Sequence, residues 1–196
     1  MTRRAAEPAA KAAWHEGWLE GARRVDSPNF GPRPACAAIE LAIVHSISLP
    51  PGRYGGDAIE RFFTNRLDPA VHPYFRAIAG LRVSSHFLIR RDGEPLQFVS
   101  CAQRAWHAGE SSFRGRAGCN DFSVGIELEG LEGEAFEDAQ YERLGEVLSH
   151  LVAAYPIGAV ASHSHVAPGR KHDPGNAFDW GRLRALPELA GLDFCP

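Results

Sequence analysis

Two histidines and an aspartate in this sequence have the residue types and the spacing of a metal site. The chain has nine histidines, and Asp173 follows His163 by ten positions across a Pro-Gly turn. His45 follows the apolar stretch 39–44, which is typical of a strand covered on both faces, and we expect that strand to end at His45. Ligands collect at the carboxyl ends of strands in α/β sheets. Two imidazoles and one carboxylate are plausible ligands for catalytic zinc, which leaves a fourth position for water.

The residues alone leave other interpretations open. A single histidine at a strand end is more often a hydrogen-bonded core residue than a ligand. His165 also competes with His163, because residues two apart in an extended segment point the same way. Spacing does not decide which of the two binds the metal.

Two further side chains have properties suited to hydrolysis. Glu127 lies in the alternating segment 123–128, and burial there would raise its pKa toward that of a general base. If the face that carries Glu127 and Glu129 is solvated, Glu127 is instead an ordinary surface residue. Lys171 could stabilise an oxyanion, although a loop lysine is normally just solvated.

The polar, glycine-rich segment 101–122 is long for a connection in a small domain, and such loops often line sites. Trp106 and His107 lie in it, and with Arg82 they are candidates for a substrate cleft. The ordinary alternative is that Trp106 is buried and that Arg82 forms a surface ion pair.

Strands and helices alternate along the chain, which predicts an α/β fold with a central mixed, partly parallel sheet flanked by helices. A hairpin turn is expected at residues 91–93. The expected strands are 17–25, 39–44, 83–89, 96–99, 123–128 and 159–161. The expected helices are 58–66, 73–81, 138–155 and a final turn at 180–186, with a loop at 163–176.

Length and composition limit the class of protein. The 196 residues predict one domain over residues 17–196, preceded by a tail or marginal helix at 1–16. The chain has 21 basic and 24 acidic residues, a balance that disfavours nucleic acid as a partner. The four cysteines lack the close spacing of thiolate zinc sites. The longest apolar tract, 151–161, is too short for a membrane span, and no export signal is recognisable, so we expect a cytoplasmic protein without membrane contact.

Five separated stretches resemble the zinc amidases of the N-acetylmuramoyl-L-alanine amidase family, and the resemblance runs from about residue 18 to about residue 186. The stretches are VHSISLPPG at 44–52, RVSSH at 82–86, RAWHAG at 104–109, NDFSVGIELEG at 120–130 and APGRKHDPG at 167–175. The resemblance implies the fold of phage T7 lysozyme and the peptidoglycan recognition proteins.

The same resemblance implies roles for individual residues. His45, His163 and Asp173 match the zinc ligands, one ion per chain, and Glu127 and Lys171 match the catalytic residues. A glutamate at position 127, where the wider family often has tyrosine, points to the cytoplasmic branch that acts on 1,6-anhydro-muropeptides.

The implied reaction is hydrolysis of the amide between the lactyl group of (1,6-anhydro-)N-acetylmuramic acid and L-alanine of the stem peptide, in muropeptide recycling. The alternatives are a lysin-type amidase that attacks polymeric peptidoglycan and a binding module without activity. Two positions depart from the family: Ser46, a candidate substrate contact, stands where asparagine is usual, and His165 stands where an acidic residue is usual.

Overall fold

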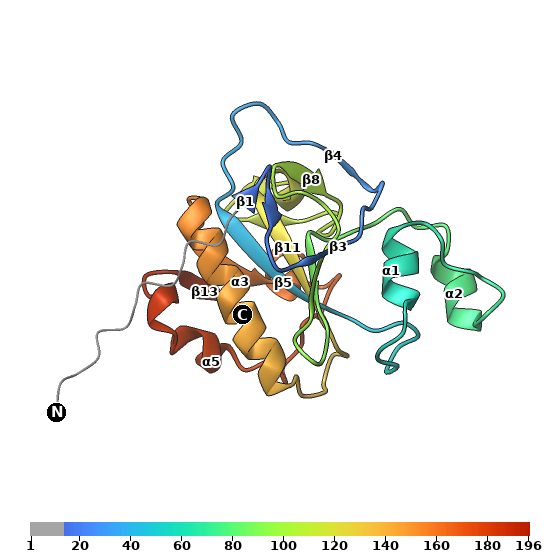
Figure 1. Ribbon diagram of the computed structural model, residues 1–196. Coiled ribbons are helices and arrows are strands. Elements are labelled where there is room, and N and C mark those ends of the chain that lie inside the picture. Colours follow the sequence, from blue (N-terminus) through green and yellow to red (C-terminus); the bar gives the residue numbers. More distant parts are fainter. Residues whose placement is uncertain (1–13) are drawn as a thin grey trace.

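A seven-stranded mixed sheet forms the centre of the molecule (Figure 1). The computed structural model describes residues 14–196. The strand order is β13-β12-β5-β11-β6-β7-β3, and every neighbouring pair is parallel except β6 with β7. The prediction of a mixed, partly parallel sheet flanked by helices is therefore confirmed.

The strands are β1 (Trp14–His15), β2 (Trp18–Leu19), β3 (Arg23–Arg24), β4 (Phe30–Pro32), β5 (Leu41–Ile47), β6 (Phe87–Ile89), β7 (Pro95–Gln97), β8 (Gln103–Ala105), β9 (Ser112–Phe113), β10 (Arg116–Ala117), β11 (Ser123–Glu129), β12 (Ala159–Ser162) and β13 (Asp193–Cys195). The α-helices are α1 (Ala58–Phe63), α2 (Pro73–Ile78), α3 (Asp138–Ala154), α4 (His163–Val166) and α5 (Trp180–Arg184), and two short 3-10 helices lie at Cys119–Asp121 and Pro187–Leu189.

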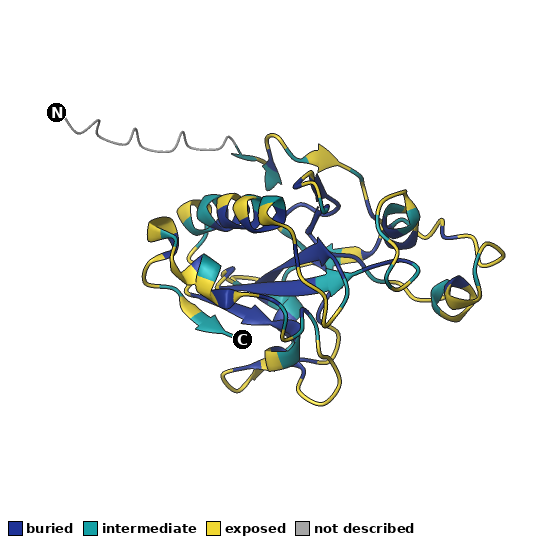
Figure 2. Cartoon of the chain, turned by 90° about the horizontal axis from the view of Figure 1, so that it is seen from below, coloured by how far each residue is buried: buried dark blue, intermediate teal, exposed yellow. Residues whose placement is uncertain are grey.

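Helix α3 covers one face of the sheet. Its apolar residues recur every three or four positions, so Leu144, Leu148 and Leu151 face the strands and are fully buried. They pack against the even-numbered side chains of β11, such as Val124 and Ile126. Figure 2 shows the buried strands and the exposed outer face of this long helix.

The opposite face of the sheet is covered by the segment 106–122. Leu41 and Ile43 of β5 pack there against Ala108 and Phe113. Because both faces are covered, β5 carries apolar residues at consecutive positions, as a strand buried on two sides requires. The odd-numbered residues of β11 share this face, so Glu127 lies on the side away from α3.

Helices α1 and α2 lie beside the sheet and form a second apolar cluster (Figure 1). Phe62 and Phe63 of α1 and Phe75 of α2 contribute to it. Phe62 and Phe63 of this cluster also line the cleft described below.

Several predicted elements differ from the structure. Strand β5 does not end at His45 but continues to Ile47, because its partner β11 extends equally far and pairs with it throughout. The predicted strand 17–25 is two short strands, β2 and β3, separated by a turn at Gly21. Of the predicted tail, residues 1–13 lie outside the described residues, and Trp14–His15 form β1.

The predicted loop 163–176 begins with a helical turn, α4. The predicted hairpin is present, with Gly93 in the left-handed region that its turn requires. Within residues 14–196, no helix is both long and apolar enough to cross a membrane.

Candidate metal centre and active site

Parallel pairing of three strands brings His45, Glu127 and His163 to one edge of the sheet. The register of β5 and β11 places His45 directly beside Glu127. The register of β12 and β5 pairs Ser162 with Val44, so His163, the next residue, follows beside His45. Residues far apart in sequence therefore converge where parallel strands end, which is the usual place for ligands in such sheets.

A short helical turn and the loop after it bring Asp173 to the same edge. The hydroxyl of Ser162 accepts a hydrogen bond from the His165 amide at 2.9 Å and caps α4. The amide of Ser164 donates to the Asp173 carbonyl at 3.0 Å, which closes the loop. The Asp173 side chain thereby returns to His163.

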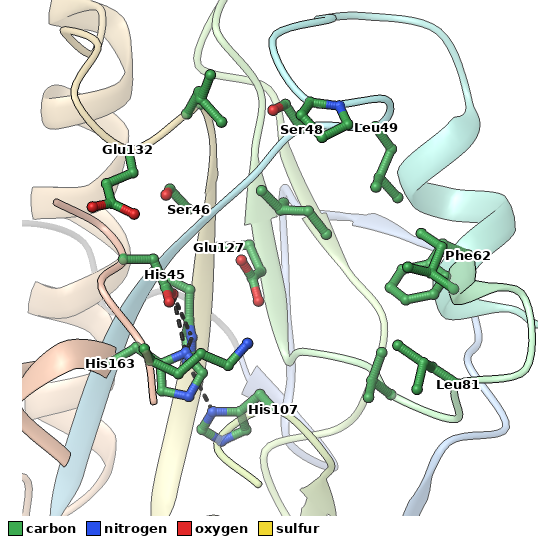
Figure 3. Close-up of a pocket in the computed structure, with 18 of the residues that line it drawn as sticks. His45, Ser46, Ser48, Leu49, Phe62, Leu81, His107, Glu127, Glu132 and His163 are labelled. Atoms are coloured by element: carbon green, nitrogen blue, oxygen red, sulfur yellow. Dashed lines mark hydrogen bonds and ion pairs between the residues drawn. The ribbon is translucent and has the colours of Figure 1, made fainter. Parts of the chain in front are cut away.

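Three ligand atoms lie within contact distance of one another (Figure 3). His45 Nδ1 lies 2.9 Å from His163 Nδ1, His163 Nδ1 lies 3.0 Å from Asp173 Oδ2, and His45 Nδ1 lies 3.3 Å from Asp173 Oδ2. Ligands about 2.0–2.1 Å from an ion at the corners of a tetrahedron are about 3.3 Å apart. The triangle therefore has the dimensions of one face of a tetrahedral zinc site.

The donor and acceptor chemistry of the triangle also fits a cation. His163 Nε2 contacts the Ala108 carbonyl at 3.3 Å, and a carbonyl only accepts. A neutral His163 thus has its proton on Nε2 and a lone pair on Nδ1. The carboxylate of Asp173 also offers only lone pairs, so these groups meet through acceptors that a positive ion would satisfy.

Burial and the contacts among the candidate ligands set their charges. Burial, and then the neighbouring imidazole of His163, lower the pKa of His45 to about 4, so His45 is neutral near pH 7. Burial alone would raise the pKa of Asp173, but contacts with His163 and His45 outweigh it, and the net pKa lies below its usual range. A neutral imidazole and an ionised carboxylate are the forms that bind a metal.

Glu127 is buried, with 8% of its surface exposed, at the floor of a cleft. Burial, and then the negative charge of Asp173, raise its pKa well above 4.5, while Lys171 opposes the rise. Of the two interpretations left open by the sequence, the desolvated one is correct. Glu129 is buried as well and forms an ion pair with Arg90 at 3.0 Å, so it does not mark a solvated face.

The cleft above these residues has a volume of about 430 Å³. Lys171 and three of the predicted substrate contacts, Ser46, Trp106 and His107, line it. Figure 3 shows Glu127 beside His45, with Phe62 and Leu81 across the cleft. The candidate metal ligands and an apolar wall thus form opposite sides of one cavity.

Arg82, a predicted substrate contact, and His165, the alternative ligand to His163, both lie away from the candidate metal centre. Arg82 is exposed and does not line the cleft. Its guanidinium donates to the carbonyls of Ala79 and Leu81. His165 is exposed and lies near Phe113, with ring centroids 6.0 Å apart. Because residues 163–166 form a helical turn, side chains two apart diverge by about 200°, which is why His165 does not compete with His163.

Two residues that support the candidate ligands, Arg170 and His107, have no such role predicted from the sequence. Arg170 donates to the Ala108 carbonyl at 2.6 Å, the same oxygen that His163 contacts. His107 was predicted to contact substrate, yet both of its ring nitrogens have partners inside the protein, His45 Nε2 at 3.0 Å and Ser123 Oγ at 3.3 Å. Burial, and then His45, lower the pKa of His107 well below 6.5.

Fold and site together define a protein with a candidate His-His-Asp metal centre at the edge of a mixed sheet. The family model described as N-acetylmuramoyl-L-alanine amidase matches residues 36–176. The chain therefore belongs to the N-acetylmuramoyl-L-alanine amidase family.

Individual relatives agree with this assignment. The 1,6-anhydro-N-acetylmuramyl-L-alanine amidase AmpD of Citrobacter freundii is 55% identical over 173 residues, which cover 87% of this chain and 92% of the relative. A crystal structure of a selenomethionine AmpD derivative has a TM-score of 0.86 at 54% identity and covers 88% of this chain and 98% of that chain. A structure of human PGRP-IBETAC has a TM-score of 0.58 at 17% identity over 90% of this chain and 99% of that chain, which supports the shared fold alone. The fold predicted from the resemblance is confirmed.

Proposed function

We propose that this protein is a zinc-dependent amidase that hydrolyses the amide between the lactyl group of 1,6-anhydro-N-acetylmuramic acid and L-alanine of the stem peptide. The convergence of His45, His163 and Asp173 through three lone-pair atoms 2.9–3.3 Å apart is the observation that carries the proposal. The high identity to an amidase named for this substrate supports the specificity.

His45, His163 and Asp173 would hold the ion. Zinc in such a site lowers the pKa of a bound water to about 7 and polarises a carbonyl. Other divalent ions of the first transition row also accept this ligand set, so metal analysis is part of the test.

Glu127 acts as the general base in this proposal. Its carboxyl lies beside His45 and lines the cleft, and burial raises its pKa, which is the direction of shift that favours uptake of a proton by a general base. It takes a proton from the attacking water and delivers one to the nitrogen of the leaving L-alanine. Lys171, which lines the same cleft, stabilises the negative charge that develops on the former carbonyl oxygen.

The substrate class separates the proposal from its alternatives. We propose that the natural substrate is a free anhydro-muropeptide and that the enzyme acts in the cytosol. Purified protein should be assayed with anhydro-muropeptide and with intact peptidoglycan sacculi, and products followed by mass spectrometry as release of the free stem peptide. Faster cleavage of the free muropeptide is expected, and faster cleavage of sacculi would favour a lysin-type amidase.

A metal-free sample provides the control. Treatment with a chelator should abolish turnover, and added Zn²⁺ should restore it, with about one ion per chain in the active sample. Binding of muropeptide without any cleavage in the zinc-loaded protein would instead favour a binding module.

A further inference from the structure

The ring of His107 lies directly against the backbone of strand β11 at Gly125. A Cβ atom added to Gly125 would lie 2.4 Å from His107 Cγ and 2.5 Å from His107 Nδ1. Glycine in the interior of a strand often marks a close approach of this kind. The site of contact is the strand face that also carries Ser123 and Glu127, opposite α3.

A line of hydrogen bonds connects His45 to the interior through His107. His45 Nε2 lies 3.0 Å from His107 Nδ1, His107 Nε2 lies 3.3 Å from Ser123 Oγ, and Ser123 Oγ donates to the Cys119 carbonyl at 2.6 Å. His45, His107 and Ser123 are all buried, at 1%, 9% and 0% exposure. Solvent therefore does not compete for these bonds.

The donor and acceptor of each hydrogen bond in this line follow from the Cys119 carbonyl at its buried end. The Cys119 carbonyl can only accept, so it takes the single hydroxyl proton of Ser123, and Ser123 Oγ then accepts from His107 Nε2. A neutral imidazole has one N–H and one lone pair, so His107 Nδ1 must accept from His45 Nε2. His45 is left with its lone pair on Nδ1, the atom that faces His163 and Asp173.

We propose that His107, held by Ser123, is a positioning residue that fixes the tautomer and ring orientation of the metal ligand His45, rather than a substrate contact. The inference rests on the proposed function, because it assumes that His45 binds the metal. Partners of this kind commonly change metal affinity by about 10- to 100-fold.

Zinc affinity and the tautomer of His45 test this role separately from packing. His107→Phe keeps an aromatic ring against Gly125 but removes the acceptor, whereas His107→Asn offers Oδ1 near the position of Nδ1. Affinity for Zn²⁺ alone is measured by competition with a chelator, and the His45 tautomer by ¹⁵N NMR of the metal-free protein.

We expect wild-type protein to show His45 protonated on Nε2. We expect His107→Phe to lose about 10- to 100-fold in Zn²⁺ affinity and to show a mixture of His45 tautomers. His107→Asn should recover most of both properties. Equal losses in the Phe and Asn variants would overturn the acceptor argument.

The outcomes distinguish this inference from the proposed function. Wild-type protein that binds no Zn²⁺ would overturn the proposed function. Wild-type binding with unchanged affinity and tautomer in both His107 variants would overturn the positioning role and leave the function intact. If His107→Phe does not fold, Ser123→Ala decides, because it removes the acceptor that orients His107. Unchanged affinity and an unchanged His45 tautomer in Ser123→Ala would then overturn the inference.

Discussion

Replacing Gly125 by alanine is the change that reports most directly on how the strand supports the site. Gly125 lies in the interior of β11, where glycine is ordinarily less favourable than alanine. At a glycine whose conformation and surroundings accept alanine, the substitution stabilises a protein by about 0.4–1 kcal/mol. Judged from the strand alone, Gly125→Ala should therefore stabilise the protein.

The position of His107 reverses that expectation. The new Cβ would lie 2.4 Å from His107 Cγ, whereas carbon atoms in contact are about 3.5–4.0 Å apart, so the ring must withdraw by about 1 Å. Since His107 Nδ1 lies 2.5 Å from the same added atom, a shift of this size would disturb its 3.0 Å hydrogen bond to His45 Nε2. We expect a loss of about 1–3 kcal/mol in the free energy of unfolding from overpacking and a Zn²⁺ affinity lower by about 10- to 100-fold.

Urea unfolding of the metal-free protein and chelator competition with Zn²⁺ measure the two effects. Gly31→Ala is a matched control, since Gly31 is also in a strand, β4, and its added Cβ would have its nearest neighbour at an ordinary 3.5 Å. The control should be at least as stable as wild type. A Gly125→Ala protein that matches wild type in stability and in Zn²⁺ affinity would show that the His107 ring is not held against this strand.

Three further predictions concern Glu127, the buried imidazole of His86 and His165. Glu127→Gln should lower kcat by about 10²- to 10⁴-fold with zinc retained. Stability should not fall, because burial disfavours the charged carboxylate that the substitution removes. Full turnover in this variant would contradict the proposed role of Glu127. Its control, Glu129→Gln, weakens the buried pair with Arg90 and should cost about 1.5–3 kcal/mol in urea unfolding while the folded protein keeps turnover within tenfold of wild type. Burial, and then Arg33, lower the pKa of His86 to about 3. Between pH 6.5 and about 3 the unfolded chain therefore binds more protons than the folded one, so the free energy of unfolding decreases as the pH falls through that range. For His86 alone this amounts to about 2 kcal/mol between pH 7 and pH 5, and an NMR titration in which the His86 ring of the folded, metal-free protein takes up a proton near pH 6.5 would be inconsistent with a neutral buried ring. His165→Ala should leave zinc content at one ion per chain and kcat within about twofold of wild type, because the side chain is exposed; loss of zinc in this variant would place His165 at the metal.

Helices and strands whose apolar residues recur at regular spacing could be predicted from the sequence. Helix α3 and strand β11 lie within one residue of the predicted bounds, because the spacing of their apolar residues matches a helix buried on one side and an alternating strand. The position of His45 beside Glu127 depends on the register of two parallel strands about eighty residues apart. Periodicity within each strand carries no information about that register.

The sequence predicts the candidate ligands but not the hydrogen bonds that hold them in place. From the residues alone, His163 and His165 were equivalent, and the helical turn of α4 separates them. The contact between His107 and Ser123 joins a loop to a strand, so no spacing rule predicts it. Gly125, a glycine inside an alternating strand, is the kind of residue from which such a close approach could have been predicted.

The proposed function requires that His45, His163 and Asp173 hold a single zinc ion. Crystals of the zinc-loaded protein, with anomalous diffraction recorded at the zinc edge, test it directly. We predict one peak about 2.0–2.2 Å from His45 Nδ1, His163 Nδ1 and Asp173 Oδ2. A peak bound to His165, or coordination of His45 through Nε2, would contradict this set of ligands.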